Sequence, residues 1–473
     1  MARQIAAFRY DQGLAPPATW ATIGFLGICG VMMAALSLHL PLTGTEAQIL
    51  GRAQFGATAD TPIPQFHDLA AALGGLLLPD AFALRGPFVV SMMLGGLALI
   101  RISAKVGVGT HAANLGLAWG FTTVLVLGGG ALAGPGPLGF LTLSAFTLAV
   151  LRLAATDQKA DWIVLWGATV LMVYAIPELA TAVVAVAMAP VLLRPCRRWL
   201  LRPGYWATLG SATLLVIPSA QIAGIDVIWP AISLQAGIGW QTLWLVFAAS
   251  PLVLSAMIYG LLAGPGVPSQ NPPRTLVYLI CLGCTVSLIA SGVKPALLLA
   301  MFPLMAIPGA DAVLRAGTRM GDLIANLTLP LSVAGLLTLL VLEIAPGAPF
   351  WARFAPLPSA QGWVGMAYEV DALADQNGVG WIAVDRPGDA VQLQRSLPRR
   401  LPIIVIGHAP VALVDCAKPG LFLGDVNGPS LQMVFDQYRM VLPIERSAAA
   451  GSSGARRTAV TGAPIDRGHC VTS

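Results

Sequence analysis

About eleven apolar stretches, each close to the length of a membrane-spanning helix, occupy most of the first 345 residues. Backbone groups inside a lipid bilayer must hydrogen-bond to one another, so apolar stretches of this length are predicted to be helices. The sequence therefore predicts a polytopic α-helical membrane protein. The predicted spans are 18–40, 86–102, 112–132, 138–155, 161–176, 179–194, 204–222, 240–263, 275–292, 294–312 and 325–345.

The composition agrees with this class and excludes others. Hydrophobic residues make up 56% of the sequence, charged residues make up 10%, and the mean hydropathy is +0.76. A soluble enzyme with so few charges could not cover its surface with polar side chains. The formal net charge of +5 comes mainly from Lys and Arg in alternate loops, which indicates orientation in a membrane rather than binding to nucleic acid.

The charge of the loops predicts the orientation, because Lys and Arg concentrate on the cytoplasmic side of a membrane. One side of the predicted spans holds Arg52, Arg85 and Lys294, and the other side holds many more basic residues. An odd number of crossings places the N-terminus in the cytoplasm and puts both the first loop, 41–85, and the C-terminal region outside it. We therefore expect a multi-pass protein of the bacterial inner (plasma) membrane with a periplasmic C-terminal domain. The residues on the basic side are Arg3, Arg9, Arg101, Lys105, Lys159, Arg194, Arg197, Arg198, Arg202, Arg274, Arg315 and Arg319.

The chain changes character after the membrane domain, residues 1–345. Residues 346–446 predict a small extracytoplasmic α/β domain, and 447–473, rich in Ala, Gly, Ser, Thr and Arg, predict a disordered tail. Cys416 and Cys470 are able to pair in an oxidising compartment, although their spacing does not require it. The elements predicted in the α/β domain are a helix at 364–376, a turn at Asn377-Gly378, a strand at 381–384, a helix at 389–397 and a strand at 403–406.

Glu46 is the first candidate for chemistry, because it follows the first span closely and is expected near the outer membrane surface. A carboxylate at this depth is able to act as general base on an acceptor hydroxyl. The alternative is that Glu46 belongs to the first turn of an interfacial helix, where the helix dipole stabilises its charge. The sequence leaves both interpretations open.

His67 and Asp68 form a second polar group in the first loop. They open an apolar stretch, Leu69 to Leu78, that predicts a helix lying along the membrane interface. Glu46 and His67, with Asp68, are candidate ligands for a divalent metal, but their wide separation in sequence makes the pattern weak. A solvated helix cap is the alternative interpretation.

Lys294 and Glu178 are expected in two of the outer loops. A Lys at this position is able to neutralise a lipid phosphate as a point charge, although ordinary snorkelling to the interface also explains it. Glu178 follows Pro177 and could line the same cavity. Cys281 and Cys284 form a C-x-x-C pair within an apolar span, where packing is the expected role.

The order of these features resembles the bacterial dolichyl-phosphate-mannose-protein mannosyltransferase-like family, which is glycosyltransferase family 39 of the GT-C superfamily. That family has an Asp-Glu pair early in the first outer loop, where this chain has Thr45-Glu46, and a His-Pro-Pro-Leu-like element, which Phe66-His-Asp-Leu-Ala70 matches through His67. Lys294-Pro-Ala-Leu-Leu-Leu is similar to its basic residue before a Leu- and Pro-rich helix. Two acidic residues of the family pattern are absent, because Thr45 and Gly136 stand where the family has Asp.

The resemblance implies a GT-C-like fold and transfer of a sugar, with inversion, from a polyprenyl-phosphate donor to an acceptor hydroxyl outside the cytoplasm. The acceptor would be a lipid, glycan or protein of the cell envelope. It further implies that Glu46 is the base, that Lys294, with Arg52, stabilises the leaving phosphate, and that His67, Asp68 and Glu178 contribute to substrate binding. No nucleotide or soluble cofactor is implied.

Two other functions stay open at this stage. One is an inactive relative that binds lipid-linked sugar or scaffolds an envelope complex. The other is a transporter, which repeated halves and paired discontinuous helices would favour, and the sequence has no convincing internal repeat.

Overall fold

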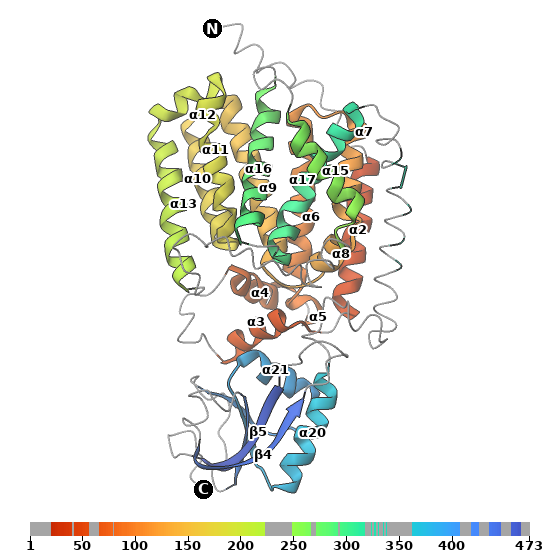
Figure 1. Cartoon of the computed structure of the whole chain (residues 1–473), viewed down its shortest axis with the longest axis vertical. Helices are drawn as coiled ribbons and strands as arrows, with labels where there is room; N and C mark the ends of the chain where they lie inside the picture. Colours follow the sequence, from red (N-terminus) through yellow and green to blue (C-terminus); the bar gives the residue numbers. More distant parts are fainter. Residues whose placement is uncertain are drawn as a thin grey trace. The chain divides into compact units, whose positions relative to one another are not determined.

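The computed structural model describes residues 20–39, 42–55, 66–78, 80–222, 248–265, 271–291, 294–316, 362–406, 418–424, 435–445 and 456–464, with isolated positions between 323 and 337. The chain divides into two compact units (Figure 1). Unit 1 comprises Met1–Leu38 and Gln65–Leu340, and unit 2 comprises His39–Pro64 and Val341–Ser473. Each unit is therefore built from two separate pieces of the sequence.

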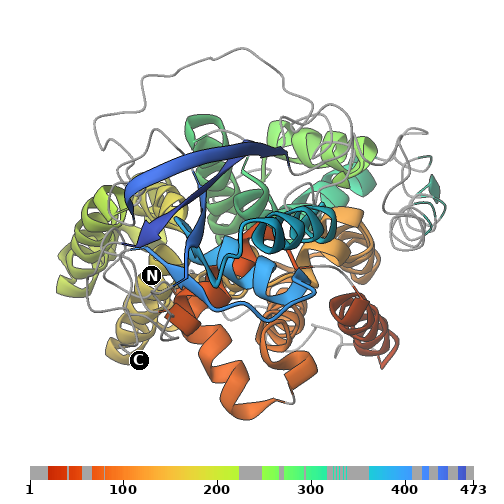
Figure 2. The same ribbon diagram turned by 90° about the horizontal axis from the view of Figure 1, so that it is seen from below.

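Unit 1 is a bundle of apolar helices, many of which are seen end-on in Figure 2. Five of the described helices are long and apolar enough to cross a membrane, or up to seven if each of two bent helix pairs is one span. Its elements are α2 (Trp20–His39), α4 (Phe66–Leu77), α5 (Asp80–Ala83), α6 (Gly86–Val106), α7 (Thr110–Phe121), α8 (Val124–Gly130), α9 (Pro135–Thr156), α10 (Lys159–Ala175), η1 (Pro177–Leu179), α11 (Ala180–Ala187), α12 (Ala189–Leu192), η2 (Arg194–Leu201), α13 (Pro203–Ile222), α15 (Pro251–Ala263), α16 (Pro272–Ser291) and α17 (Pro295–Ala316).

Most predicted spans coincide with these helices to within a few residues. The span predicted at 112–132 is divided into α7 and α8, which are bent by 61°. The span predicted at 179–194 is divided into η1, α11 and α12. The span at 325–345 and the first part of the span at 240–263 lie outside the described residues, apart from isolated positions.

Helix α17 lies at the centre of unit 1, where its neighbours approach it through glycines. A Cβ atom at Gly116 of α7 would lie 2.9 Å from the Cα of Ile307, and one at Gly260 of α15 would lie 2.7 Å from the Cα of Gly309. Helices in lipid gain little from hydrophobic burial, so small residues that permit close van der Waals packing stabilise their association.

Basic residues gather at the ends of several helices of unit 1. Arg274 at the start of α16 and Arg315 at the end of α17 both pair with Asp311, with nitrogen-to-oxygen distances of 3.0 Å. Asn271, just before α16, donates to the carbonyl of Val106 at the end of α6. The ends of α6, α16 and α17 that were predicted to share one side of the membrane therefore lie together in this bundle.

Unit 2 contains a five-stranded sheet with the order β2-β1-β3-β5-β4. Strand β1 is parallel to β2 and β3, and β5 is antiparallel to β3 and β4. Arg399, just before β2, donates to Asp375 of helix α20 at 2.7 Å, which lowers the pKa of that carboxyl below its usual range. The elements are α3 (Gly44–Phe55), α20 (Trp363–Gln376), β1 (Trp381–Val384), α21 (Pro387–Ser396), β2 (Ile403–Val405), β3 (Gly420–Gly424), β4 (Phe435–Glu445) and β5 (Arg456–Pro464).

The core of unit 2 forms between the sheet and its helices. Trp363 and Val370 of α20, Leu393 of α21, Ile382 of β1 and Leu421 of β3 are all buried in one cluster. Apolar side chains on one face of each helix supply this core, as the 3.6-residue period of the sequence predicts. The helix, strand, helix and strand predicted between 364 and 406 are present with nearly the predicted bounds.

Two features of unit 2 differ from the sequence-based expectation. Strand β5 lies at 456–464, within the stretch predicted to be disordered, and it pairs with β3 on one side and β4 on the other. Residues 39–64 of the first loop group with the C-terminal region rather than with the helical bundle. Cys416 and Cys470 lie outside the described residues.

Candidate functional site

Glu46 lies in the first turn of α3, fully buried, as part of a capping box. Its Oε2 accepts hydrogen bonds from the backbone N–H of Thr43 at 2.9 Å and from the Thr43 hydroxyl at 3.1 Å. The backbone N–H of Glu46 donates in turn to the Thr43 hydroxyl oxygen at 3.2 Å. The alternative interpretation of Glu46 as a first-turn residue thus has a defined geometry. The Thr-x-x-Glu spacing that begins at Thr43 was the sequence signal for this cap.

Helix α3 is held against α21 within unit 2 by close backbone approach. A Cβ at Gly51 would lie 2.6 Å from the carbonyl carbon and oxygen of Pro387, and one at Gly388 would lie 3.1 Å from Gln48. The buried amide of Gln392 donates to the carbonyl oxygen of Leu42 at 2.9 Å, directly before the capping Thr43. The C-terminal domain therefore fixes the start of the helix that carries Glu46, a role that the sequence did not reveal.

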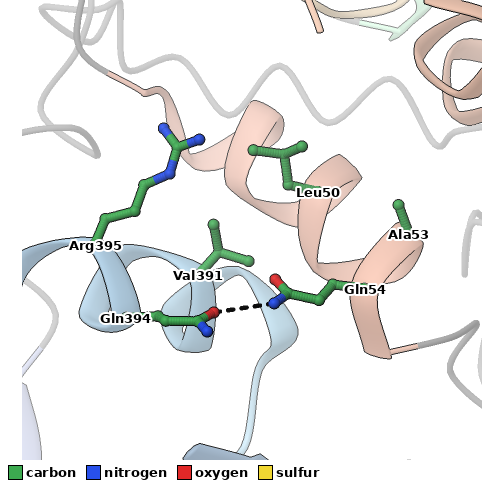
Figure 3. A pocket seen from close by; sticks show the side chains of 6 residues that line it. All are labelled: Leu50, Ala53, Gln54, Val391, Gln394 and Arg395. Carbon is green, nitrogen blue, oxygen red and sulfur yellow. Dashed lines mark hydrogen bonds between the residues drawn. The ribbon is translucent and has the colours of Figure 1, made fainter. Parts of the chain in front are cut away.

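A hollow of about 470 Å³ opens between α3 and α21 (Figure 3). A hydrogen bond between two side-chain amides crosses the hollow, in which Gln54 Nε2 donates to Gln394 Oε1 at 3.1 Å. The side chains that line the hollow are Leu50, Ala53, Gln54, Val391, Gln394 and Arg395. Arg52, which was expected to help bind phosphate, lies on α3 and is partly buried, but it is not among these lining residues.

His67 and Asp68 lie in the first turn of α4, in unit 1. The His67 Nε2 atom lies 3.8 Å from Asp68 Oδ1, and the His67 residue is buried. Asp68 is also close enough to Tyr174 near the end of α10 to interact with it electrostatically. The first turn of α4 therefore lies near the end of α10 that precedes Glu178.

Helix α4 has an apolar outer face of four leucines. Their exposed positions recur at the helical spacing of one face, which is typical of a helix at a membrane interface. A helix is thus present in the stretch predicted to lie along the membrane interface, with bounds Phe66–Leu77. The four residues are Leu69, Leu73, Leu76 and Leu77.

Lys294 and Glu178, which were predicted to approach the same cavity, form an ion pair in unit 1. Lys294 Nζ lies 2.5 Å from Glu178 Oε1, and their side chains are 47% and 18% exposed. The Glu178 carbonyl accepts a hydrogen bond from the hydroxyl of Ser287 on α16 at 2.6 Å, which fixes the turn that carries the carboxylate. An exposed ammonium opposite a fixed carboxylate is able to exchange that partner for a phosphate.

Gly136 stands where the resembled family has an Asp, and the structure gives this position little space. A Cβ there would lie 2.7 Å from Cδ2 of Leu299 on α17. Any larger side chain at position 136 would require Leu299 to move. The side chain of Thr45, at the other departure from the family pattern, lies outside the described part of the chain.

No group of three His, Cys, Asp or Glu residues is arranged to hold a metal ion in the part of the chain that the structure describes. His67 and Asp68 belong to unit 1, and Glu46 belongs to unit 2. Cys281 and Cys284 are free thiols buried in α16.

The sequence matches no known protein-family model and no curated protein. Solved structures do match. The structure of ArnT from Cupriavidus metallidurans bound to undecaprenyl phosphate has a TM-score of 0.50 and 13% sequence identity, and the match covers 97% of this chain and 100% of that chain. This likeness confirms the predicted fold class, a GT-C-like helical membrane protein with a small α/β part. At 13% identity, the likeness is evidence for the fold and not for the activity.

Two further solved structures are similar at lower scores. ArnT from Cupriavidus metallidurans in the apo state has a TM-score of 0.49 and 13% identity, covering 94% of this chain and 98% of that chain. The cryo-EM structure of the arabinofuranosyltransferase AftD from Mycobacteria has a TM-score of 0.41 and 16% identity, covering 93% of this chain and 40% of that chain. Membership of glycosyltransferase family 39 stays a prediction.

Proposed function

We propose that this chain is a membrane glycosyltransferase that moves a sugar, with inversion, from a polyprenyl-phosphate donor to an acceptor hydroxyl outside the cytoplasm. The observation that carries the proposal is the full-length fold match to a protein whose structure holds undecaprenyl phosphate. The ion pair of Lys294 and Glu178 supports it, because an exposed Lys beside a bilayer suits a lipid phosphate. The proposed setting is the bacterial inner membrane, with the N-terminus in the cytoplasm and unit 2 outside.

In the proposed reaction the acceptor oxygen attacks the anomeric carbon while the bond from that carbon to the phosphate oxygen breaks. The polyprenyl phosphate leaves with the bonding electron pair, and Lys294, with Arg52, stabilises its charge. Glu46 takes the proton of the acceptor hydroxyl. His67, Asp68 and Glu178 are proposed to orient the substrates. The acceptor is a lipid, glycan or protein of the envelope.

A second candidate function is a catalytically inactive GT-C relative that binds lipid-linked sugar or scaffolds an envelope complex. Two observations favour it. The carboxylate of Glu46 is engaged in the cap of its own helix, and Leu299 fills the space beside Gly136, where the family has an Asp. The two candidates share donor binding and differ in transfer.

Purified protein incubated with labelled polyprenyl-phosphate sugars and envelope acceptors tests the proposal. The key variant is Glu46→Gln, because a glutamine at the fourth position of a capping box preserves the cap while it removes the base. We expect the wild type to transfer sugar and Glu46→Gln to lose about 100-fold or more of that activity.

Two controls separate the base from the cap. Thr43→Ala weakens the cap, at a cost of about 1 kcal/mol, and keeps the carboxylate, so transfer is expected to persist within a few-fold. Glu369→Gln removes an exposed carboxylate of α20 and should behave as wild type. Equal transfer by Glu46→Gln and wild type eliminates Glu46 as the base, and no transfer by the wild type across a broad donor set favours the inactive relative.

A further inference from the structure

The hollow between α3 and α21 is open to solvent and has both apolar and polar lining residues. Its volume, about 470 Å³, is within the range of pockets that hold small molecules. Leu50, Ala53 and Val391 give it an apolar floor, and two amides and a guanidinium give it polar edges. In Figure 3 the side chains of Gln54 on α3 and Gln394 on α21 point toward one another.

The charge of the hollow favours an anionic ligand. Arg395 is the one ionisable residue among its described lining residues. The nearby ion pairs in the described part of the chain are made by Arg399, with Asp371 at 3.6 Å and with Asp375 at 2.7 Å, rather than by Arg395. A guanidinium with five N–H donors in a fixed plane matches the geometry of a phosphate or carboxylate.

The amide pair adds a preference for hydroxyl groups. Gln54 uses one N–H to bond to Gln394 Oε1, so its own carbonyl oxygen and the Gln394 NH₂ group stay available at the edge of the hollow. An acceptor and donors side by side match a sugar hydroxyl, which both donates and accepts. The aliphatic floor complements the C–H face of a sugar ring.

We propose that this hollow binds an anionic saccharide, a hexose that carries a phosphate or a carboxylate. Its assignment as the head group of the glycosyl acceptor rests on the proposed function, whereas binding itself does not. Leu50, Ala53 and Gln54 follow Glu46 by four, seven and eight positions, so they share one face of α3 with the proposed base. The site would therefore present the acceptor along the helix that also carries Glu46.

Binding is tested on the full-length protein in lipid nanodiscs by calorimetry, without any polyprenyl donor. The probes are glucose 1-phosphate, glucuronate, the neutral methyl glucoside and inorganic phosphate. We expect both anionic sugars to bind, with an affinity that falls as salt rises, and methyl glucoside and inorganic phosphate each to bind at least tenfold more weakly. Equal binding of inorganic phosphate and glucose 1-phosphate would overturn the saccharide assignment.

Matched variants locate the binding. Arg395→Gln should lower the affinity for both anionic sugars at least tenfold, and Ala53→Leu, which fills the hollow, should lower the affinity for every sugar. Arg400→Gln removes an exposed arginine that does not line the hollow and should leave binding unchanged. Wild-type affinity in both Arg395→Gln and Ala53→Leu contradicts the inference, even if transfer is observed. Binding that depends on Arg395 without any transfer keeps the saccharide site and contradicts the proposed function.

Discussion

The ion pair of Lys294 and Glu178 is the contact with which a phosphate at Lys294 would compete. Both side chains remain partly exposed, so the pair is screened by solvent and contributes at most about 1 kcal/mol to stability. An incoming phosphate must compete with a carboxylate for the same ammonium. The sequence predicted that these two residues face one cavity, but their direct pairing depends on the turn at Pro177 and on its hydrogen bond from Ser287.

Substitutions of the two partners should act in opposite directions on donor binding. Lys294→Met removes the cation and is expected to weaken binding of undecaprenyl phosphate about tenfold, the loss of one charge-assisted hydrogen bond. Glu178→Gln removes the competing carboxylate and should strengthen binding a few-fold. Binding to the purified protein in nanodiscs measures both effects, and Lys105→Met, at the end of α6, is the control. Equal weakening of binding by both substitutions would mean that the ion pair stabilises the fold and that Lys294 does not bind the phosphate.

At the scale of single residues, the sequence predicted the position of Glu46 but not its hydrogen bonds. Glu46 was placed correctly in the first turn of a helix after the first span. The sequence left base and cap open, and the hydrogen bonds with Thr43 define the cap because they depend on the backbone geometry of the turn. The role of Glu46 as base stays a proposal. The loss of an acidic residue at Gly136 was visible in sequence, whereas the contact with Leu299 was not, because 163 positions separate the two residues.

At the scale of elements, hydrophobic length was a sufficient signal for most helices, since lipid leaves the backbone few alternatives. The bend of 61° between α7 and α8 was not predicted, because hydrophobicity is continuous across it. Strand β1 has its predicted bounds, Trp381–Val384, as expected for a short apolar run before a turn signal. Strand β5 was missed because its Ala, Gly and Pro residues have weak strand propensity, and its order comes from pairing with β3 and β4.

The packing of α3 on α21 predicts unequal effects for two glycine-to-alanine substitutions in helices. Gly51→Ala places a Cβ 2.6 Å from the backbone of Pro387, so overpacking of about 1–3 kcal/mol should outweigh the gain in helix propensity. Gly75→Ala in α4 meets no atom within 4 Å and should stabilise its helix by about 0.5–1 kcal/mol. Hydrogen exchange read by mass spectrometry should therefore speed up in α3 and α21 for the first variant and slow down in α4 for the second. Slower exchange in α3 for Gly51→Ala would show that this contact is loose.

At the scale of the whole molecule, the division into units could not be read from the order of the sequence. Residues 39–64 lie some 300 positions before the α/β domain with which they form unit 2. Hydropathy describes each segment by itself. This grouping depends on the close approach of Gly51 to Pro387 and on the hydrogen bond from Gln392 to the carbonyl oxygen of Leu42. The first loop thus contributes to both units, with α3 in one and α4 in the other.

The orientation of the chain is a prediction of the same scale, and it depends on the charges that gather at the helix ends. Lys159 begins α10 beside a cluster in which Asp157 pairs with Arg198 and Arg202, an arrangement expected on the cytoplasmic side. Asn377 follows α20 in unit 2 and is exposed. The six native cysteines are replaced, and a membrane-impermeant maleimide is applied to spheroplasts. It should label Asn377→Cys in intact spheroplasts and Lys159→Cys only after permeabilisation. The reverse pattern would invert the proposed topology. Labelling of both sites in intact spheroplasts would require an even number of crossings between them. That result would contradict the odd count on which the external position of unit 2 depends.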